Sequence, residues 1–402
     1  MNPILKRTVP KFALFLGGIL LFAFFSNDFG LIDIQKAAII LAAGIDKTPS
    51  GYELTAQISV PKGGETAGGT ASVELSGRGE TVADCLMMMY ADSGWVPKFD
   101  FCSLVLLGEE TAREGAMPAL NYFLHNEYMS DDCAVAVCEG SAADVLKQTS
   151  SIDDTSSLAI GKLFSGAAEK SGATVKNTLR KFAVDTLGVS KSSFMPYIRT
   201  LALEQDNPSE GGKEAPGGGA GESSADKSES SSQQESVLFR AEETALFAEG
   251  KMTGLLSAEE TFAYNLLIGG VSAGSLTVRG ENGLPVSLSI KRDRGKVTLS
   301  DDALPQAQLE IGLKVLVNDR TAEDFMAGTE TNVATPEDER CAEELIASHA
   351  ASLWETCRKS GCDLFLLSRD LWRSDPKRHA GLKDSIPSAI EAKIVVRVRG
   401  AK

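Results

Sequence analysis

Hydrophobic and polar residues alternate along positions 52–60, and this alternation predicts a strand with one buried face. Tyr52, Leu54, Ala56, Ile58 and Val60 lie on the apolar side. The preceding run, Ala37–Ala43, is apolar on both faces, which predicts a strand in the middle of its sheet. Between the two strands, Gly44–Lys47 predicts a turn.

Helical and strand-like patterns then follow one another up to residue 147. Thr81 is a suitable N-cap for a helix that places Val82, Leu86 and Met89 on one face. The run Met87–Met89 is expected to fill space in the core, because methionine adapts to irregular gaps. The other predicted elements are strands at Ala71–Ser76, Cys102–Leu107 and Cys133–Cys138 and helices at Glu109–Leu124 and Ala142–Lys147.

The following segment is less regular. Leu158–Lys170 and Val175–Phe182 read as amphipathic helices, and a short strand is expected near Leu201. These elements predict a smaller second domain packed on the first.

Regular patterns resume at Val237. A hairpin turning at Glu249-Gly250 is expected, and Ser257 with Glu260 forms a capping-box sequence for the helix Ala258–Leu267. A long helix is predicted from its cap at Thr335 to a stop at Gly361. His349 lies on its apolar face, where a half-buried structural histidine is expected. The predicted strands are Gly274–Arg279, Val286–Arg292, Lys296–Leu299, Gln308–Val317 and Ile390–Arg399.

These elements predict an α+β fold: a multidomain chain of mixed or antiparallel sheets with packed helices, behind an N-terminal hydrophobic anchor. Residues 206–236 contain no aromatic and no large aliphatic residue, so they cannot bury enough surface to order themselves. We expect an anchor or signal at 1–29, an α+β domain at 30–149, a smaller domain at 150–205, a disordered linker at 206–236 and a C-terminal α+β domain at 237–402.

The leader has the layout of a secretory signal. Lys6, Arg7 and Lys11 precede the apolar run Phe12–Phe25, which is shorter than the roughly 20 residues that a membrane span prefers. No small-x-small cleavage site follows it, which favours a retained anchor with the rest of the chain outside the cytoplasm. A cleaved signal remains the alternative.

Charge and chemistry exclude several functional classes. A net charge of -15 argues against a nucleic-acid binder, which needs clustered Lys and Arg. The chain has neither a P-loop nor an HExxH sequence, and its seven cysteines lack the spacing of a metal site, so no cofactor, metal or catalytic residue is assigned. The cysteines are expected to be small buried hydrophobes, with Cys133 and Cys138 on opposite faces of one strand.

One hydrolase-like pattern occurs at Gly270-Val271-Ser272-Ala273-Gly274. A nucleophile elbow needs a strand before the serine and a helix after it. Here a helix precedes and a strand follows, so the hydrolase interpretation is the weaker one.

Several segments together resemble one known family. They include Gly44-Ile45-Asp46-Lys47 before the strand to Pro61, Leu104–Gly115, Asn121–Glu127, Gly140–Leu146, Ala245–Phe247, Lys251–Ser257, Glu259–Thr261 and Tyr264–Leu267. In order and spacing they are similar to the Ger(x)C family, the C subunit of bacterial spore germination receptors. The resemblance runs from about Gly30 to Gly400, without the 206–236 insertion.

The resemblance implies a non-enzymatic, membrane-anchored, extracytoplasmic subunit of a nutrient germinant receptor. Its partners would be a multi-pass A subunit and a transporter-like B subunit in the inner spore membrane, and its role would lie in assembly or signalling during spore germination. The germinant is unknown. The alternative is an extracytoplasmic ligand-binding protein that serves a transporter or another membrane signalling system.

Three positions depart from the family pattern. The family's lipobox cysteine would fall at Asp28-Phe29, but no cysteine precedes Cys85, so the hydrophobic leader would have to hold the protein to the membrane. Phe99-Asp100-Phe101 occupies the place of a common histidine, and His125 that of the usual arginine. If those groups contact a partner in relatives, the contact has changed here.

Overall fold

The computed structural model describes residues 15–22, 37–61, 70–202, 237–280, 283–302, 305–320, 332–383 and 385–401. The expected linker at 206–236 lies outside the described residues, as does most of the expected anchor at 1–29. Residues 15–22 form a helix. Among the helices that the structure describes, none has the length and apolar character needed to cross a membrane.

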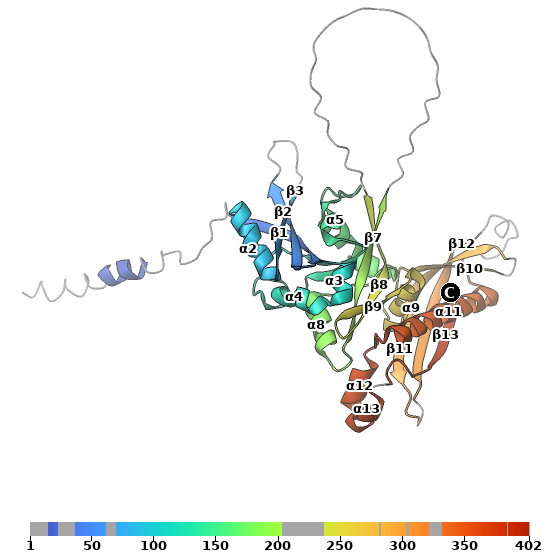
Figure 1. Ribbon diagram of the computed structural model, residues 1–402. Helices are drawn as coiled ribbons and strands as arrows, with labels where there is room; N and C mark the ends of the chain where they lie inside the picture. The colour runs from blue at the N-terminus through green and yellow to red at the C-terminus, as the bar shows by residue number, and fades with distance from the viewer. Residues whose placement is uncertain are drawn as a thin grey trace, which may run out of the picture.

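The fold is α+β, as the sequence predicts, and the larger of its two sheets has nine strands (Figure 1). Its order is β3-β2-β1-β5-β6-β7-β8-β9, and β4 pairs with the start of β1. β1, β5, β6 and β7 are parallel, and the outer pairs are antiparallel. The strands are β1 Ala37–Thr48, β2 Gly51–Pro61, β3 Thr70–Gly79, β4 Val96–Lys98, β5 Leu104–Gly108, β6 Ala134–Cys138, β7 Ser192–Ala202, β8 Val237–Ala248 and β9 Lys251–Leu256.

Helices cover both faces of this sheet. Four of them share one core: α2 Val82–Ser93, α3 Glu109–Glu114, α4 Ala116–His125 and α8 Leu179–Leu187. On the other face, α5 Ala142–Lys147 and α6 Ser156–Leu163 pack over Ala42, Leu104 and Ala136. A central strand must therefore be apolar on both sides, and β1 is central, as predicted.

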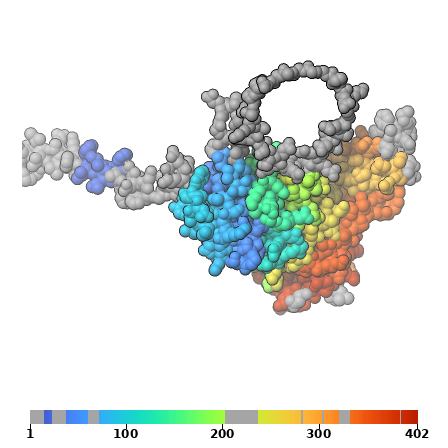
Figure 2. Space-filling model, turned by 45° about the horizontal axis from the view of Figure 1, so that its top comes forward, coloured from blue at the N-terminus to red at the C-terminus, as the bar shows by residue number. Residues whose placement is uncertain are grey.

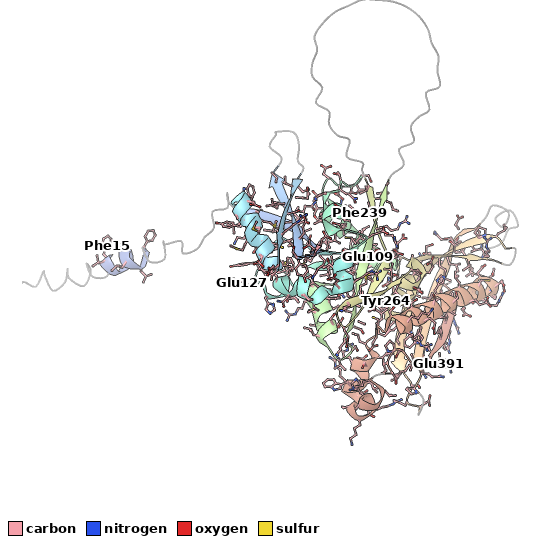
Figure 3. The ribbon with its side chains drawn as sticks, in the orientation of Figure 1. Phe15, Glu109, Glu127, Phe239, Tyr264 and Glu391 are labelled. Carbon is pink, nitrogen blue, oxygen red and sulfur yellow. The ribbon has the colours of Figure 1, made fainter. Side chains whose placement is uncertain are left out.

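The smaller sheet has the order β10-β11-β12-β13. α9 and α11 pack on it, and the shared core also takes in Val175 and Phe194 from the N-terminal half. Tyr264 on α9 lies where the two sheets meet, with its ring centroid 5.4 Å from that of Phe194 (Figure 3). The elements are α9 Ala258–Ile268, β10 Ser275–Arg279, β11 Pro285–Leu299, β12 Ala307–Arg320, α11 Pro336–Ser360, α12 Leu367–Ser374, α13 Pro376–Leu382 and β13 Ala392–Gly400, and α7 Gly166–Ser171 lies beside the loop after α9.

The two halves are in contact along the middle of the molecule (Figure 2). The large sheet itself contains strands from residues 37–108, 134–138, 192–202 and 237–256. It thus runs across the boundaries expected between 30–149, 150–205 and 237–402, which remain predictions about folding units.

Several local predictions were wrong, for identifiable reasons. Gly44–Lys47 is not a turn: it continues β1, and the chain turns at residues 49–50. The expected helix Glu109–Leu124 is two helices, because Gly115 adopts a φ of 152° and Ala116 N donates to Gly250 O at 2.8 Å. β11 is one strand rather than two, with a register shift between Ile290 and Arg292.

Burial also differs from two expectations. β2 is buried on both faces at its centre, where Thr55 and Gln57 are 0% and 1% exposed under α5 and α6. Met89 fills the core, but Met87 and Met88 are 64% and 48% exposed, so only the last methionine of that run behaves as predicted.

Candidate interaction surface

The histidines and the GxSxG serine are held apart in separate local arrangements. Ser272 lies in the loop between α9 and β10, where its N–H donates to Lys170 O at 3.0 Å. His379 Nε2 bonds Ser368 Oγ at 3.0 Å, and His349 is half-buried on α11, where burial lowers its pKa. Within the described ranges no hydrogen bond joins Ser272 to a histidine. The helix-loop-strand context is the reverse of a nucleophile elbow.

The cysteines are free thiols, and six of the seven are buried. Cys133 and Cys138 lie in the cores on opposite faces of the large sheet, as predicted. Burial raises the pKa of Cys138 and of Cys357 well above the usual range, which keeps these thiols protonated and unreactive. Among the described residues there is no cluster of three or more His, Cys, Asp or Glu side chains that could hold a metal ion.

Motif residues at 44–46 and 140–142 belong to one part-buried contact. Asp46 accepts hydrogen bonds from Ser141 Oγ at 3.0 Å and from the N–H groups of Ala142 and Ala143 at 2.8 Å each. Its carboxylate thereby caps the amino end of α5, where the helix dipole favours negative charge. Gly44 lies under the same helix: a Cβ there would approach Leu146 Cδ1 to 2.9 Å. The role of these residues is structural.

A second motif ties two helices of the C-terminal half together. Ser257 and Glu260 form a complete capping box at the start of α9, as predicted. Glu260 is only 7% exposed and also accepts the hydroxyl groups of Ser352 at 2.6 Å and Thr356 at 2.7 Å, both from α11. This carboxylate is therefore a structural link between α9 and α11.

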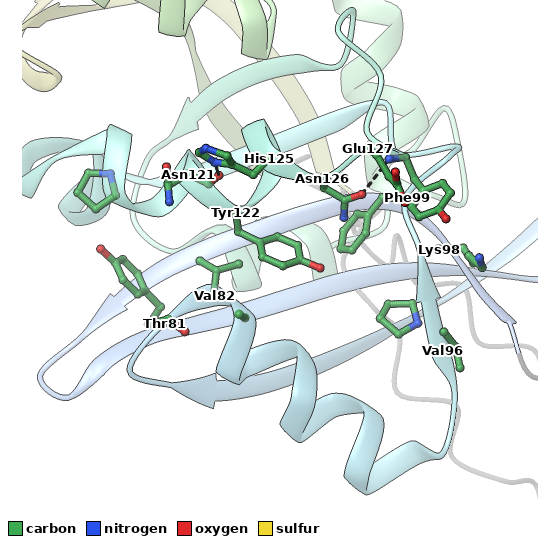
Figure 4. A pocket seen from close by; sticks show the side chains of 15 residues that line it. Thr81, Val82, Val96, Lys98, Phe99, Asn121, Tyr122, His125, Asn126 and Glu127 are labelled. Carbon is green, nitrogen blue, oxygen red and sulfur yellow. Dashed lines mark hydrogen bonds between the residues drawn. The ribbon is translucent and has the colours of Figure 1, made fainter. Parts of the chain in front are cut away.

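A groove with a volume of about 960 Å³ lies between α2 and α4 (Figure 4). We call it the α2–α4 groove. Tyr122 lies in its middle, with Thr81 toward one end and Lys98 toward the other. Its lining residues are Tyr52, Thr81, Val82, Ala83, Val96, Pro97, Lys98, Phe99, Pro118, Asn121, Tyr122, His125, Asn126, Glu127 and Tyr128.

The floor of the groove is aromatic and rigid. Phe99, Tyr122 and Phe123 form three edge-to-face pairs with centroids 5.6–6.2 Å apart. Such pairs hold one another in place through their opposed quadrupoles. Burial raises the pKa of Tyr122, so its hydroxyl stays a hydrogen-bond donor at neutral pH.

The rim of the groove carries polar groups and exposed apolar side chains. Lys98 Nζ lies 5.0 Å from the ring centroid of Tyr128, and Tyr128 N donates to Asn126 Oδ1 at 3.0 Å. Tyr128 is 52% exposed. The groove therefore combines an aromatic floor with a mixed polar and apolar rim.

Two family models match the chain, one for each half. The model described as "Spore germination protein N-terminal domain" matches residues 31–200, and the one described as "Spore germination B3/ GerAC like, C-terminal" matches residues 242–399.

The chain belongs to the Ger(x)C family.

This result confirms the resemblance drawn from the sequence. Ger(x)C proteins are membrane-associated subunits of germinant receptors, a non-catalytic kind of protein, and they associate with other receptor subunits. A solved structure similar to the chain is described as the crystal structure of the GerBC protein. It has a TM-score of 0.47 and 14% sequence identity, and the match covers 90% of this chain and 97% of that chain. A search of the curated proteins found no match.

Two of the departures from the Ger(x)C pattern meet in the α2–α4 groove. His125, in the place of the usual arginine, lines the groove beside Asn121, whose carbonyl oxygen lies 2.8 Å from His125 Nδ1. Of Phe99-Asp100-Phe101, the region in the place of the common histidine, Phe99 forms part of the floor and is 2% exposed. Sequence analysis assigned no site residues. The two departures were the available signal, but only the fold shows that they face one hollow.

Proposed function

We propose that this protein is a non-enzymatic, membrane-anchored C subunit of a nutrient germinant receptor, acting on the extracytoplasmic face in receptor assembly or signalling. Membership of the Ger(x)C family supports the receptor assignment. The A subunit and the transporter-like B subunit would be its partners, in the inner spore membrane if the host forms spores. In the absence of the lipobox cysteine, the leader would provide the anchor.

The α2–α4 groove is the surface that we assign to a partner subunit. The observation that carries this assignment is that His125 and Phe99, the latter from the Phe99-Asp100-Phe101 region, line one groove. If two residues at a contact differ from those of the family, the partner residues that they touch are expected to differ as well. The rigid aromatic floor would supply the anchoring pocket, and the groups at the rim its specificity.

The test is capture from membranes. The full chain, tagged at its C-terminus, is solubilised in mild detergent with its membranes, and the proteins recovered with it are identified by mass spectrometry. Recovery of a multi-pass subunit and a transporter-like subunit is the expected result. Recovery of neither, from membranes in which both are expressed, would contradict the receptor assignment.

Matched variants locate the contact. Ala83→Glu places a charged side chain into the groove from an exposed position on α2, and Ala351→Glu places the same side chain on the exposed surface of α11. Ala83→Glu should reduce partner recovery at least tenfold, while Ala351→Glu should leave it unchanged. Equal recovery of partner subunits with both variants would show that the partner does not bind in the groove.

The volume of the groove also suits a second candidate function, that of a ligand-binding protein serving a transporter. About 960 Å³ lies at the upper end of the range for small-molecule sites. A ligand that binds there would raise the melting temperature with its concentration, and Ala83→Glu would abolish that rise. This outcome, without partner capture, would favour the second function.

A further inference from the structure

A second exposed apolar surface lies where α8 meets α12, on elements separated by about 180 residues of sequence (Figure 1). Val184, Leu187 and Val189, on α8 and the loop after it, are 62%, 74% and 36% exposed. Trp372 on α12 is 49% exposed. Val184, Val189 and Trp372 line a hollow of about 190 Å³, and Leu187 precedes Gly188, another residue of its lining. We call these four side chains the α8–α12 patch.

The exposure of this patch is built into the fold. Arg369 N donates to Ser190 Oγ at 3.1 Å, which joins α12 to the loop after α8. Asp363, 3% exposed, caps α12 by accepting the N–H groups of Leu367 and Ser368 at 2.8 Å each. Its own N–H donates to Ser192 Oγ at 2.9 Å. The patch is thus fixed at both helices.

The charge around the patch has the opposite sign to that of the whole protein. From Leu367 to Leu382 the chain has four Arg or Lys and two Asp residues, a balance of +2 in a chain with a net charge of -15. Both carboxylates are engaged: Asp370 contacts Arg369, and Asp375 caps α13. Within the described part of the chain, Arg373 and Lys377 have no carboxylate partner.

We propose that the α8–α12 patch lies against an anionic lipid surface. Tryptophan and aliphatic side chains beside cations are the combination that enters the headgroup region of a bilayer. Arg373 and Lys377 would face lipid phosphates, and Trp372 and Leu187 would lie at the boundary of the acyl chains. Arg373 and Lys377, which have no carboxylate partner among the described residues, favour a surface rich in phosphate over an uncharged one. The proposal rests on the membrane association of the family and is independent of the groove.

The experiment reconstitutes the full chain into vesicles that contain phosphatidylglycerol with brominated acyl chains, which quench tryptophan at contact. The chain has three tryptophans; Trp354 is 3% exposed in the core, and Trp95, between α2 and β4, is 42% exposed. Bromolipid should quench part of the emission. Trp372→Phe should remove that quenching, and the matched variant Trp95→Phe should retain it. Equal quenching in wild type and Trp372→Phe, or no association with the vesicles, would overturn the proposal.

The role of charge is tested in the same vesicles. Replacing phosphatidylglycerol by phosphatidylcholine should reduce the quenching of Trp372 at least threefold, and Arg373→Glu with Lys377→Glu should abolish the difference between the two lipids. The contrary result is that bromolipid leaves the emission of Trp372 unquenched while Trp372 is shielded from solvent in the captured receptor. That result would assign the patch to a protein partner and contradict the proposal. Partner capture by Trp372→Phe should equal that of wild type. A negative result in the vesicle experiment would therefore contradict only the lipid proposal and leave the proposed receptor function standing.

Discussion

Asp46 is the residue whose loss should most clearly weaken the N-terminal half. Its carboxylate, on the central strand β1, accepts three hydrogen bonds at the start of α5, almost 100 residues further along the chain. Asp46→Ala would leave the N–H groups of Ala142 and Ala143 without partners. Ser141 would remain as the only side-chain cap that α5 has among the described residues.

The cost can be worked out from these contacts. A hydrogen bond to a charged group contributes about 1.5–3 kcal/mol, and the loss of a helix cap costs about 1 kcal/mol. Because the three bonds share one carboxylate and water can enter the part-buried site, we expect a total of about 3 kcal/mol for Asp46→Ala. With a urea dependence of about 2–3 kcal/mol per molar, the midpoint of unfolding should fall by roughly 1–1.5 M.

The assay is urea unfolding in mild detergent, followed by circular dichroism. Asp144→Ala is the matched control, since Asp144 is an exposed acid in the first turn of the same helix and contributes only about 0.5 kcal/mol through the helix dipole. A midpoint for Asp46→Ala within about 0.3 M of that of Asp144→Ala would refute the reasoning, because it would mean that the capping contact contributes no more than a surface charge.

Two further predictions concern the C-terminal half. Asp338→Ala should lower the free energy of unfolding by about 3–5 kcal/mol, because it leaves the buried Arg320 without the carboxylate that lies 2.5 Å away. Adding Arg320→Met should recover part of this stability, measured by thermal unfolding. A double variant that is less stable than Asp338→Ala would contradict the prediction. Burial raises the pKa of Asp293 to about 7, although backbone groups of Val271, Gly270 and Arg294 act in the opposite direction. Because its folded pKa lies above the unfolded value of about 3.9, stability should fall as the pH rises from about 4 to 7. Asp293→Asn should abolish this fall and raise the melting temperature at pH 8 but not at pH 4; parallel pH profiles for variant and wild type would show that the interpretation is wrong.

Much of the fold could be predicted because local signals and tertiary structure agree. The cap at Thr81 and the capping box at Ser257 begin their helices where the sequence indicates, and Gly361 ends α11 as predicted. The apolar run from Ala37 predicted a central strand, and β1 is central. In each case the controlling contacts lie within a few residues, so they can be read from the sequence.

Predictions failed where a distant contact decided the outcome. Gly44 reads as a turn residue but stays in β1, since its lack of a side chain makes room for Leu146. Gln57 reads as solvent-facing, but its side chain bonds Leu146 O at 3.0 Å and Ser156 Oγ at 2.9 Å beneath α5 and α6. A period of two cannot reveal a helix that covers the polar face.

The candidate site could be predicted only in part. The sequence singled out the Phe99-Asp100-Phe101 region and His125 as departures from the Ger(x)C pattern, but Phe99 and His125 are 26 positions apart, one after β4 and the other at the end of α4. Their meeting depends on the packing of α4 against β4 and α2, which no local pattern specifies.

Partner capture with the matched groove variants tests the central claim most directly. Tagged wild type and Ala351→Glu should bring a multi-pass subunit and a transporter-like subunit out of the membrane together, and Ala83→Glu should lose at least nine-tenths of both. Undiminished capture by Ala83→Glu would contradict the assignment of the groove, and the absence of both subunits from the wild-type sample would contradict the assignment of the protein to a receptor complex.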